Sequence, residues 1–83
     1  MAGPTAPSVI SPDEFAHIAR ALFGEAWQIP LAKALGRSDH LVRQLSVGER
    51  QIDAELAAQL ARLCEEHVEK LTRIARQLRQ QLT

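Results

Sequence analysis

The sequence contains few of the residues that sheets, disulfide frameworks and membrane spans require. Two phenylalanines and one tryptophan are its only aromatic residues, and a composition this rich in alanine and leucine favours helices over strands. The single cysteine, Cys64, excludes an intramolecular disulfide and a multi-cysteine zinc site. No stretch approaches the roughly 18 apolar residues of a membrane span, and the N-terminus lacks the basic region and apolar run of a signal peptide. We therefore expect an all-α, cytoplasmic protein.

The chain also lacks net charge and any arrangement typical of catalysis. Ten basic residues balance ten acidic ones. This balance argues against a nonspecific polycation but leaves specific DNA binding open, because phosphate contact depends on where the charge lies. No Ser/His/Asp arrangement, inward carboxylate pair or phosphate-binding glycine loop is present, and 83 residues are too few to enclose a substrate pocket. The sequence therefore predicts no enzyme, no metal site and no cofactor.

Prolines, glycines and capping residues divide the chain into three parts. Residues 1–10 carry two prolines and a glycine without a charged side chain, so we expect a flexible N-terminal arm that does not reach into a DNA groove. Residues 11–53 are expected to form a compact helical core, which begins at the capping box of Ser11 and Glu14. Residues 54–83 contain neither proline nor glycine, which predicts one long C-terminal helix.

Within the core, residues 28–47 have the pattern of two short helices joined by a tight turn. Gly36 supplies a residue that tolerates the left-handed conformation of such a turn. The apolar residues that would hold the two helices together are Leu31, Ala32, Leu35, Val42 and Leu45. The stretch WQIPLAKALGRSDHLVRQLSVGER resembles the lambda-repressor/Cro-like helix-turn-helix family, including the Gly-Glu-Arg that often follows the second helix in bacterial members. This resemblance implies a compact, all-α helix-turn-helix domain.

The resemblance also implies that the second helix enters the major groove of double-stranded DNA. Arg43 is a candidate reader of guanine and Gln44 of adenine, because each side chain can bond bidentately to the base edge. His40 and Asp39 complete the base-reading candidates, although Asp39 is equally interpreted as a helix-capping acid or as an ion-pair partner of Arg43. The phosphate-contact candidates are Gln28, Lys33, Arg37, Ser38, Ser46 and Arg50.

Two residues depart from the family pattern. Arg37 follows the turn glycine, where an apolar residue is usual, and we expect it to face a phosphate. Leu41 lies where a polar, DNA-facing residue is common; contact with a thymine methyl is one interpretation, and packing is the one we favour. Trp27, beside the start of the first motif helix, is expected in the core.

The long C-terminal helix is expected to serve both core packing and dimerisation. Its second half would expose an apolar stripe unless a partner covered it, and pairing between two copies is the simplest solution. The predicted seam comprises Leu60, Cys64, His67, Leu71, Ile74 and Leu78, which alternate four and three residues apart. The basic side chains from Lys70 to Arg79 suit the negative end of the helix dipole, or else lie along DNA or an acidic partner.

Together these features predict a sequence-specific, double-stranded DNA-binding regulator. We expect a homodimeric repressor of a short inverted repeat, of a kind found in phages, mobile elements and autoregulated operons, including the repressors that accompany anti-CRISPR genes. No small-molecule ligand or membrane contact is expected. The alternative is a helical protein-interaction module whose helix-turn-helix-like core does not bind DNA.

Overall fold

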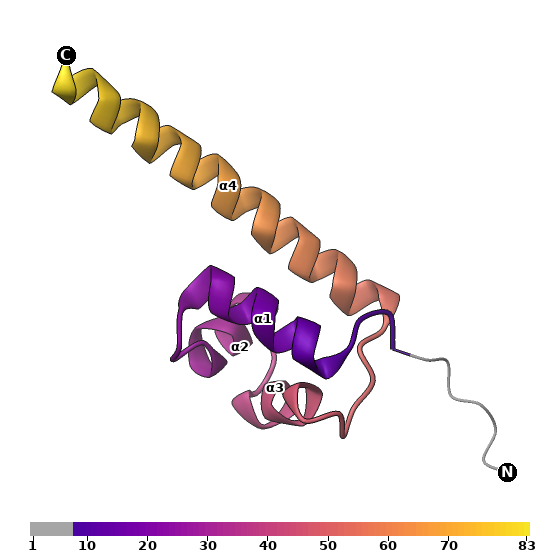
Figure 1. Ribbon diagram of the computed structural model, residues 1–83. Helices are drawn as coiled ribbons and strands as arrows, with labels where there is room; N and C mark the ends of the chain where they lie inside the picture. Colours follow the sequence, from indigo (N-terminus) through magenta and orange to yellow (C-terminus); the bar gives the residue numbers. More distant parts are fainter. Residues whose placement is uncertain (1–7) are drawn as a thin grey trace, which may run out of the picture.

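The computed structural model describes residues 8–83, which fold into four helices and no strand (Figure 1). The helices are α1 (Pro12–Phe23), α2 (Gln28–Leu35), α3 (Asp39–Ser46) and α4 (Ala54–Leu82). The prediction of an all-α chain with a long C-terminal helix is confirmed. None of these helices combines the length and the apolar composition that crossing a membrane demands.

Three side-chain caps fix where the helices begin. Ser11 accepts a hydrogen bond from the Glu14 N–H at 3.0 Å while the Glu14 carboxylate faces the Ser11 N–H, so the predicted capping box is present. Ser38 Oγ accepts from the N–H three residues later at 3.1 Å and starts α3. Asp53 does the same for α4, accepting from the Leu56 N–H at 2.8 Å. Each cap satisfies a backbone donor that the first helical turn leaves unpaired.

One apolar core joins all four helices. Phe15 of α1 is fully buried and contacts Trp27 edge to face, with ring centroids 5.9 Å apart and an interplanar angle of 80°. The remaining buried residues are Ala19, Leu31, Ala32, Leu35, Val42, Leu45, Ile52, Leu56 and Leu60. The predicted helix-turn-helix scaffold therefore lies inside, as does Trp27, and Leu41 packs half-buried against the core. Burial of this set positions α2 and α3 rigidly against α1.

The helix α4 runs past the other three helices, and its C-terminal half projects away from them (Figure 1). The molecule consequently measures 65 × 21 × 20 Å. Leu60 is only 2% exposed, because this part of α4 packs on the domain's own core. Its expected place in the dimer seam is therefore wrong in this chain, and the exposed stripe begins later, with Val68, Leu71, Ile74 and Leu78.

The segment before α1 is attached to the loop before α4. The Val9 N–H donates to the Ile52 carbonyl at 2.8 Å, and the Ile52 N–H donates to Ser8 Oγ at 3.0 Å. Ile10 packs half-buried against the core. The expected flexible arm of residues 1–10 therefore does not include residues 8–10, and residues 1–7 lie outside the described part of the chain.

The turn between α2 and α3 depends on Gly36, whose φ of 67° and ψ of 34° are left-handed. A Cβ added there meets no atom within 4 Å, so the cost of a side chain is backbone strain alone. We expect Gly36→Val to lower the free energy of unfolding by about 1–2 kcal/mol or more. Gly36→Asn should cost clearly less, because asparagine tolerates this conformation. Thermal melting followed by circular dichroism measures both, and equal losses for the two variants would contradict the assignment.

Candidate nucleic-acid interface

The burial of α3 determines which of its side chains face solvent. Val42 and Leu45 point into the core and are 0% and 3% exposed. Because residues along a helix turn by about 100° each, the opposite side of α3 carries His40, Arg43, Gln44 and Val47. The structure leaves His40 and Arg43 exposed and Gln44 half-exposed. We call these four residues the outward face of α3.

Val47 belongs to this face but was absent from the expected site residues. Its side chain is 63% exposed at the C-terminal end of the helix, where the backbone ends α3. Val47 lies three residues after Gln44 and four after Arg43. This helical spacing is the signal in the sequence that would have placed Val47 on the same face. An exposed branched side chain among polar ones provides an apolar contact surface, of the kind that meets a thymine methyl.

The polar side chains beside this face differ in whether they already bond to other groups of the protein. Asp39 is exposed, and the ion pairs within residues 8–83 do not join it to Arg43, so the intrahelical pair is absent. Asp39 instead lies in the first turn of α3, where its charge suits the helix dipole. Ser46 Oγ donates to the Arg43 carbonyl at 2.7 Å, which engages the hydroxyl hydrogen expected to meet a phosphate. Ser38 Oγ accepts the capping bond and keeps its hydrogen to donate.

Among residues 8–83, the start of α2 has backbone donors without partners. No side chain caps this helix. The first backbone bond that closes its N-terminal turn is from the Leu31 N–H to the Trp27 carbonyl, at 2.9 Å. The N–H groups of Gln28 and Ile29 therefore remain open to an acceptor, and the Gln28 side chain is exposed beside them. Such a helix terminus suits a phosphate oxygen. Lys33, one and a half turns later, is exposed as well.

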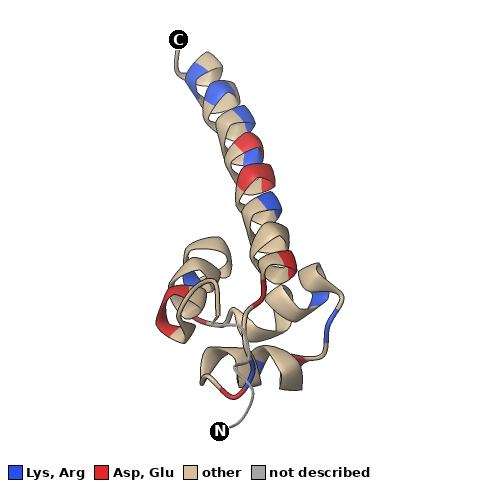
Figure 2. Ribbon diagram, turned by 90° about the vertical axis from the view of Figure 1, so that its right-hand side faces the viewer, with Lys and Arg blue, Asp and Glu red and all other residues tan. Residues whose placement is uncertain are grey.

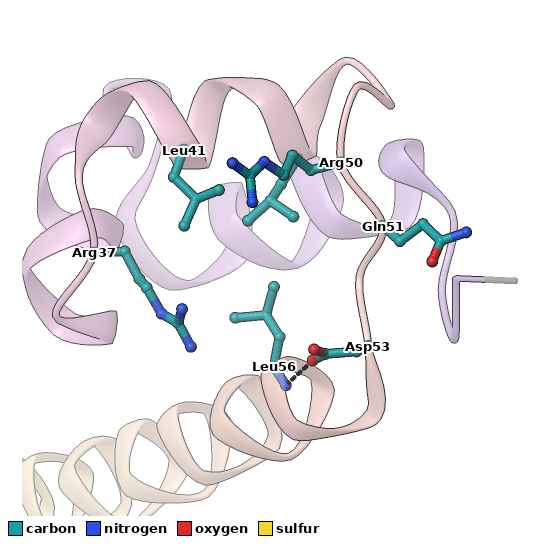
Figure 3. Close-up of a pocket in the computed structure, with 7 residues that line it drawn as sticks. Arg37, Leu41, Arg50, Gln51, Asp53 and Leu56 are labelled. Carbon is teal, nitrogen blue, oxygen red and sulfur yellow. Dashed lines mark hydrogen bonds between the residues drawn. The ribbon is translucent and has the colours of Figure 1, made fainter. Parts of the chain in front are cut away.

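Two expected phosphate-contact residues, Arg37 and Arg50, lie on another side of the motif (Figure 3). Both line a shallow pocket between α3 and the start of α4, whose apolar base consists of Leu41, Leu45 and Leu56. In Figure 3 the Arg37 side chain extends toward Leu56, and the Arg50 guanidinium lies near Leu41. The two guanidinium groups therefore lie on the side of α3 that faces α4, apart from its outward face.

The structure thus brings the base-reading candidates together on α3, with Ser38 at the N-terminus of that helix. The N-terminus of α2 is a separate candidate contact for a phosphate oxygen. Within residues 28–50, four basic side chains stand against two acidic ones. The exposed cations and amides on this surface can donate to phosphate oxygens and base edges. Searches against models of protein families, curated proteins and solved structures found no match to this chain.

Proposed function

We propose that this chain is a sequence-specific double-stranded DNA-binding protein that acts as a homodimeric repressor of a short inverted repeat. The observation that carries the proposal is the outward face of α3, which presents Arg43 and Gln44 from a helix fixed by two buried residues. A rigid helix with exposed bidentate donors meets the geometric requirement for reading base edges in a major groove.

The open N-terminus of α2 supports the same proposal. Phosphate contacts determine the register of a protein on the duplex, and backbone N–H groups at helix ends commonly supply them. In this arrangement Gln28 anchors one phosphate while Lys33, Arg37 and Arg50 contribute charge around the reading helix. The bound protein occludes its site, and occlusion suffices for repression.

Replacement of Arg43 tests the base-reading role. We expect Arg43→Ala to weaken binding to the selected site by about 1–3 kcal/mol, roughly 5- to 150-fold, and to relax the preference at one base pair. The site is first obtained by selection from random duplexes, and affinities are then measured by electrophoretic shift. Arg62→Ala is the matched control, because Arg62 is an exposed arginine on α4, outside this surface. Equal affinities for the parent and Arg43→Ala would contradict the assignment.

Replacement of Lys33 separates phosphate contact from base reading. We expect Lys33→Ala to weaken binding to every duplex by a similar factor and to lower the slope of log affinity against log salt by about 1. The measurement is a salt titration with the selected site and with an unrelated duplex. An unchanged slope would remove Lys33 from the phosphate contacts.

The alternative function, a protein-interaction module, is favoured by one specific observation. Ile29 and Val47 are 59% and 63% exposed near the motif, and apolar side chains at this exposure are suited to a protein partner. The two functions differ in their affinity for DNA at low salt. A DNA-binding protein of this type binds any duplex weakly through phosphates, so complete absence of binding at low salt would leave the interaction module as the function.

A further inference from the structure

A shallow pocket lies between α3 and the start of α4, apart from the outward face of α3 (Figure 3). Leu41 and Leu45 of α3 and Leu56 of α4 form its apolar base, and its volume is about 100 Å³. Arg37 lines the pocket from the turn before α3, and Arg50 lines it from the loop after α3. Apolar and cationic groups from several segments of the chain therefore meet in one place.

The backbone from which each arginine extends is held in place. The Arg37 N–H donates to the Ala32 carbonyl at 2.9 Å, at the left-handed turn that ends α2. Two residues after Arg50, Ile52 is fully buried, and its N–H donates to Ser8 Oγ at 3.0 Å. A ligand in the pocket therefore orders two side chains rather than two loops, which lowers the entropy cost of binding.

The charged groups around the pocket leave one net positive charge, because two guanidinium groups stand against the carboxylate of Asp53. The ion pairs and side-chain hydrogen bonds within residues 8–83 involve neither the Arg37 nor the Arg50 guanidinium. Asp53 Oδ1 accepts the capping bond from the Leu56 N–H at 2.8 Å. A monoanion balances this set of charges, whereas a phosphate dianion would place a second negative charge near the Asp53 carboxylate.

The size and the apolar base of the pocket limit the rest of the ligand. An apolar cavity of about 150 Å³ holds a benzene ring, so a pocket of about 100 Å³ fits a smaller aliphatic group. The planar guanidinium group matches the two oxygens of a carboxylate. We propose that this pocket binds a short aliphatic monocarboxylate. Its carboxylate lies between Arg37 and Arg50, and its apolar group lies on the three leucines.

The other concentration of positive charge in the described residues offers no such combination. It lies at the C-terminal end of α4 (Figure 2), where Arg73, Arg76 and Arg79 are all exposed. This part of α4 projects away from the other helices (Figure 1), so an anion there contacts the surface of one helix. Such a surface attracts anions without regard to their shape. The pocket differs because it joins charge to an apolar base of defined size.

The inference goes beyond the proposed function and does not depend on DNA binding. The base of the pocket includes residues of both α3 and α4. A bound carboxylate therefore adds contacts between the helix that carries Arg43 and the long C-terminal helix. These contacts lie on the inner side of α3, so the outward face stays exposed when the pocket is occupied.

Titration with 3-methylbutanoate tests the pocket directly. Two-dimensional ¹H–¹⁵N NMR of the full chain at pH 7 and constant ionic strength should show saturable shifts, concentrated at the amides of Leu41, Leu45 and Leu56. Three matched probes separate the contributions: 3-methylbutanamide lacks the charge, acetate lacks most of the apolar group, and inorganic phosphate is an anion without one. Each should bind at least about tenfold more weakly. Shifts that do not saturate, shifts concentrated elsewhere, or equal binding of any of these probes would overturn the proposal.

Single substitutions then test the two arginines. Arg37→Gln and Arg50→Gln should each weaken 3-methylbutanoate binding at least about fivefold, because each removes one charged donor. Both side chains are exposed, so the dispersed spectrum of the folded chain should be retained. Arg62→Gln, an exposed arginine of α4 outside the pocket, is the matched control and should bind like the parent. Parent-like binding by both pocket variants would refute the assignment. Because the titration contains no DNA, a chain that binds 3-methylbutanoate but no duplex would refute only the proposed function.

Discussion

Phe15→Ala is expected to unfold most of the domain. Phe15 is 0% exposed and contacts Trp27, so its truncation removes buried apolar area and leaves a cavity at the junction of α1 with the helix-turn-helix pair. Such replacements cost about 3–5 kcal/mol. A core of this size rarely supplies more than about 3–5 kcal/mol of net stability. The expected loss is therefore comparable to the entire free energy of unfolding of the domain.

Urea denaturation followed by circular dichroism and tryptophan fluorescence measures this effect. Trp27 is the only tryptophan and touches Phe15, so its emission should move toward that of an exposed indole in the variant without denaturant. Phe23→Ala is the matched control, since Phe23 is the other phenylalanine and is 36% exposed. The control should lose about 1 kcal/mol or less. A denaturation midpoint for Phe15→Ala close to that of the control would contradict the role of Phe15.

The features that the sequence predicted well are those with a local cause. Ser11, Ser38 and Asp53 each bond to a backbone N–H three residues away, a relation contained within four residues of sequence. The end of α2 at Gly36 is equally local, because a left-handed residue stops the helix by its own conformation. The long helix Ala54–Leu82 followed from the absence of proline and glycine.

The features that the sequence did not predict depend on distant partners. The bonds of Ser8 and Val9 to Ile52 span more than 40 residues and leave no local pattern. Leu60 shares its helical spacing with Leu71, yet one is buried in the core and the other is exposed. Periodicity identifies the apolar side of α4, whereas only the packed structure shows where the domain ends along it.

The candidate site was predicted unevenly for the same reason. Arg43 and Gln44 could be placed on the solvent side of α3 because Val42 and Leu45 define the buried side. The hydrogen bonds and directions of individual polar side chains could not be predicted in this way. Ser46 bonds to the backbone of its own helix, and Arg37 extends toward the start of α4, because rotamers and neighbouring elements decide these contacts.

The second large effect concerns the projecting half of α4. We expect Leu71→Glu/Ile74→Glu to convert a dimer into a monomer of 9.2 kDa, because the change would bury four carboxylates in the seam of the pair. The two side chains are 51% and 43% exposed and lie outside the core, so the domain should remain folded. Sedimentation equilibrium measures the mass, and circular dichroism confirms the fold.

The effect of this variant on DNA separates dimer loss from damage to the motif. A monomer contacts only one half-site at a time. Binding to the inverted repeat should therefore weaken by about 10²–10⁴-fold, because two domains no longer bind as one unit. Binding to a duplex with a single half-site should match that of the parent. Gln77→Glu/Gln80→Glu, which adds the same charge outside the apolar stripe, should remain dimeric. A Leu71→Glu/Ile74→Glu protein that still sediments as a dimer would show that the two copies associate through another surface.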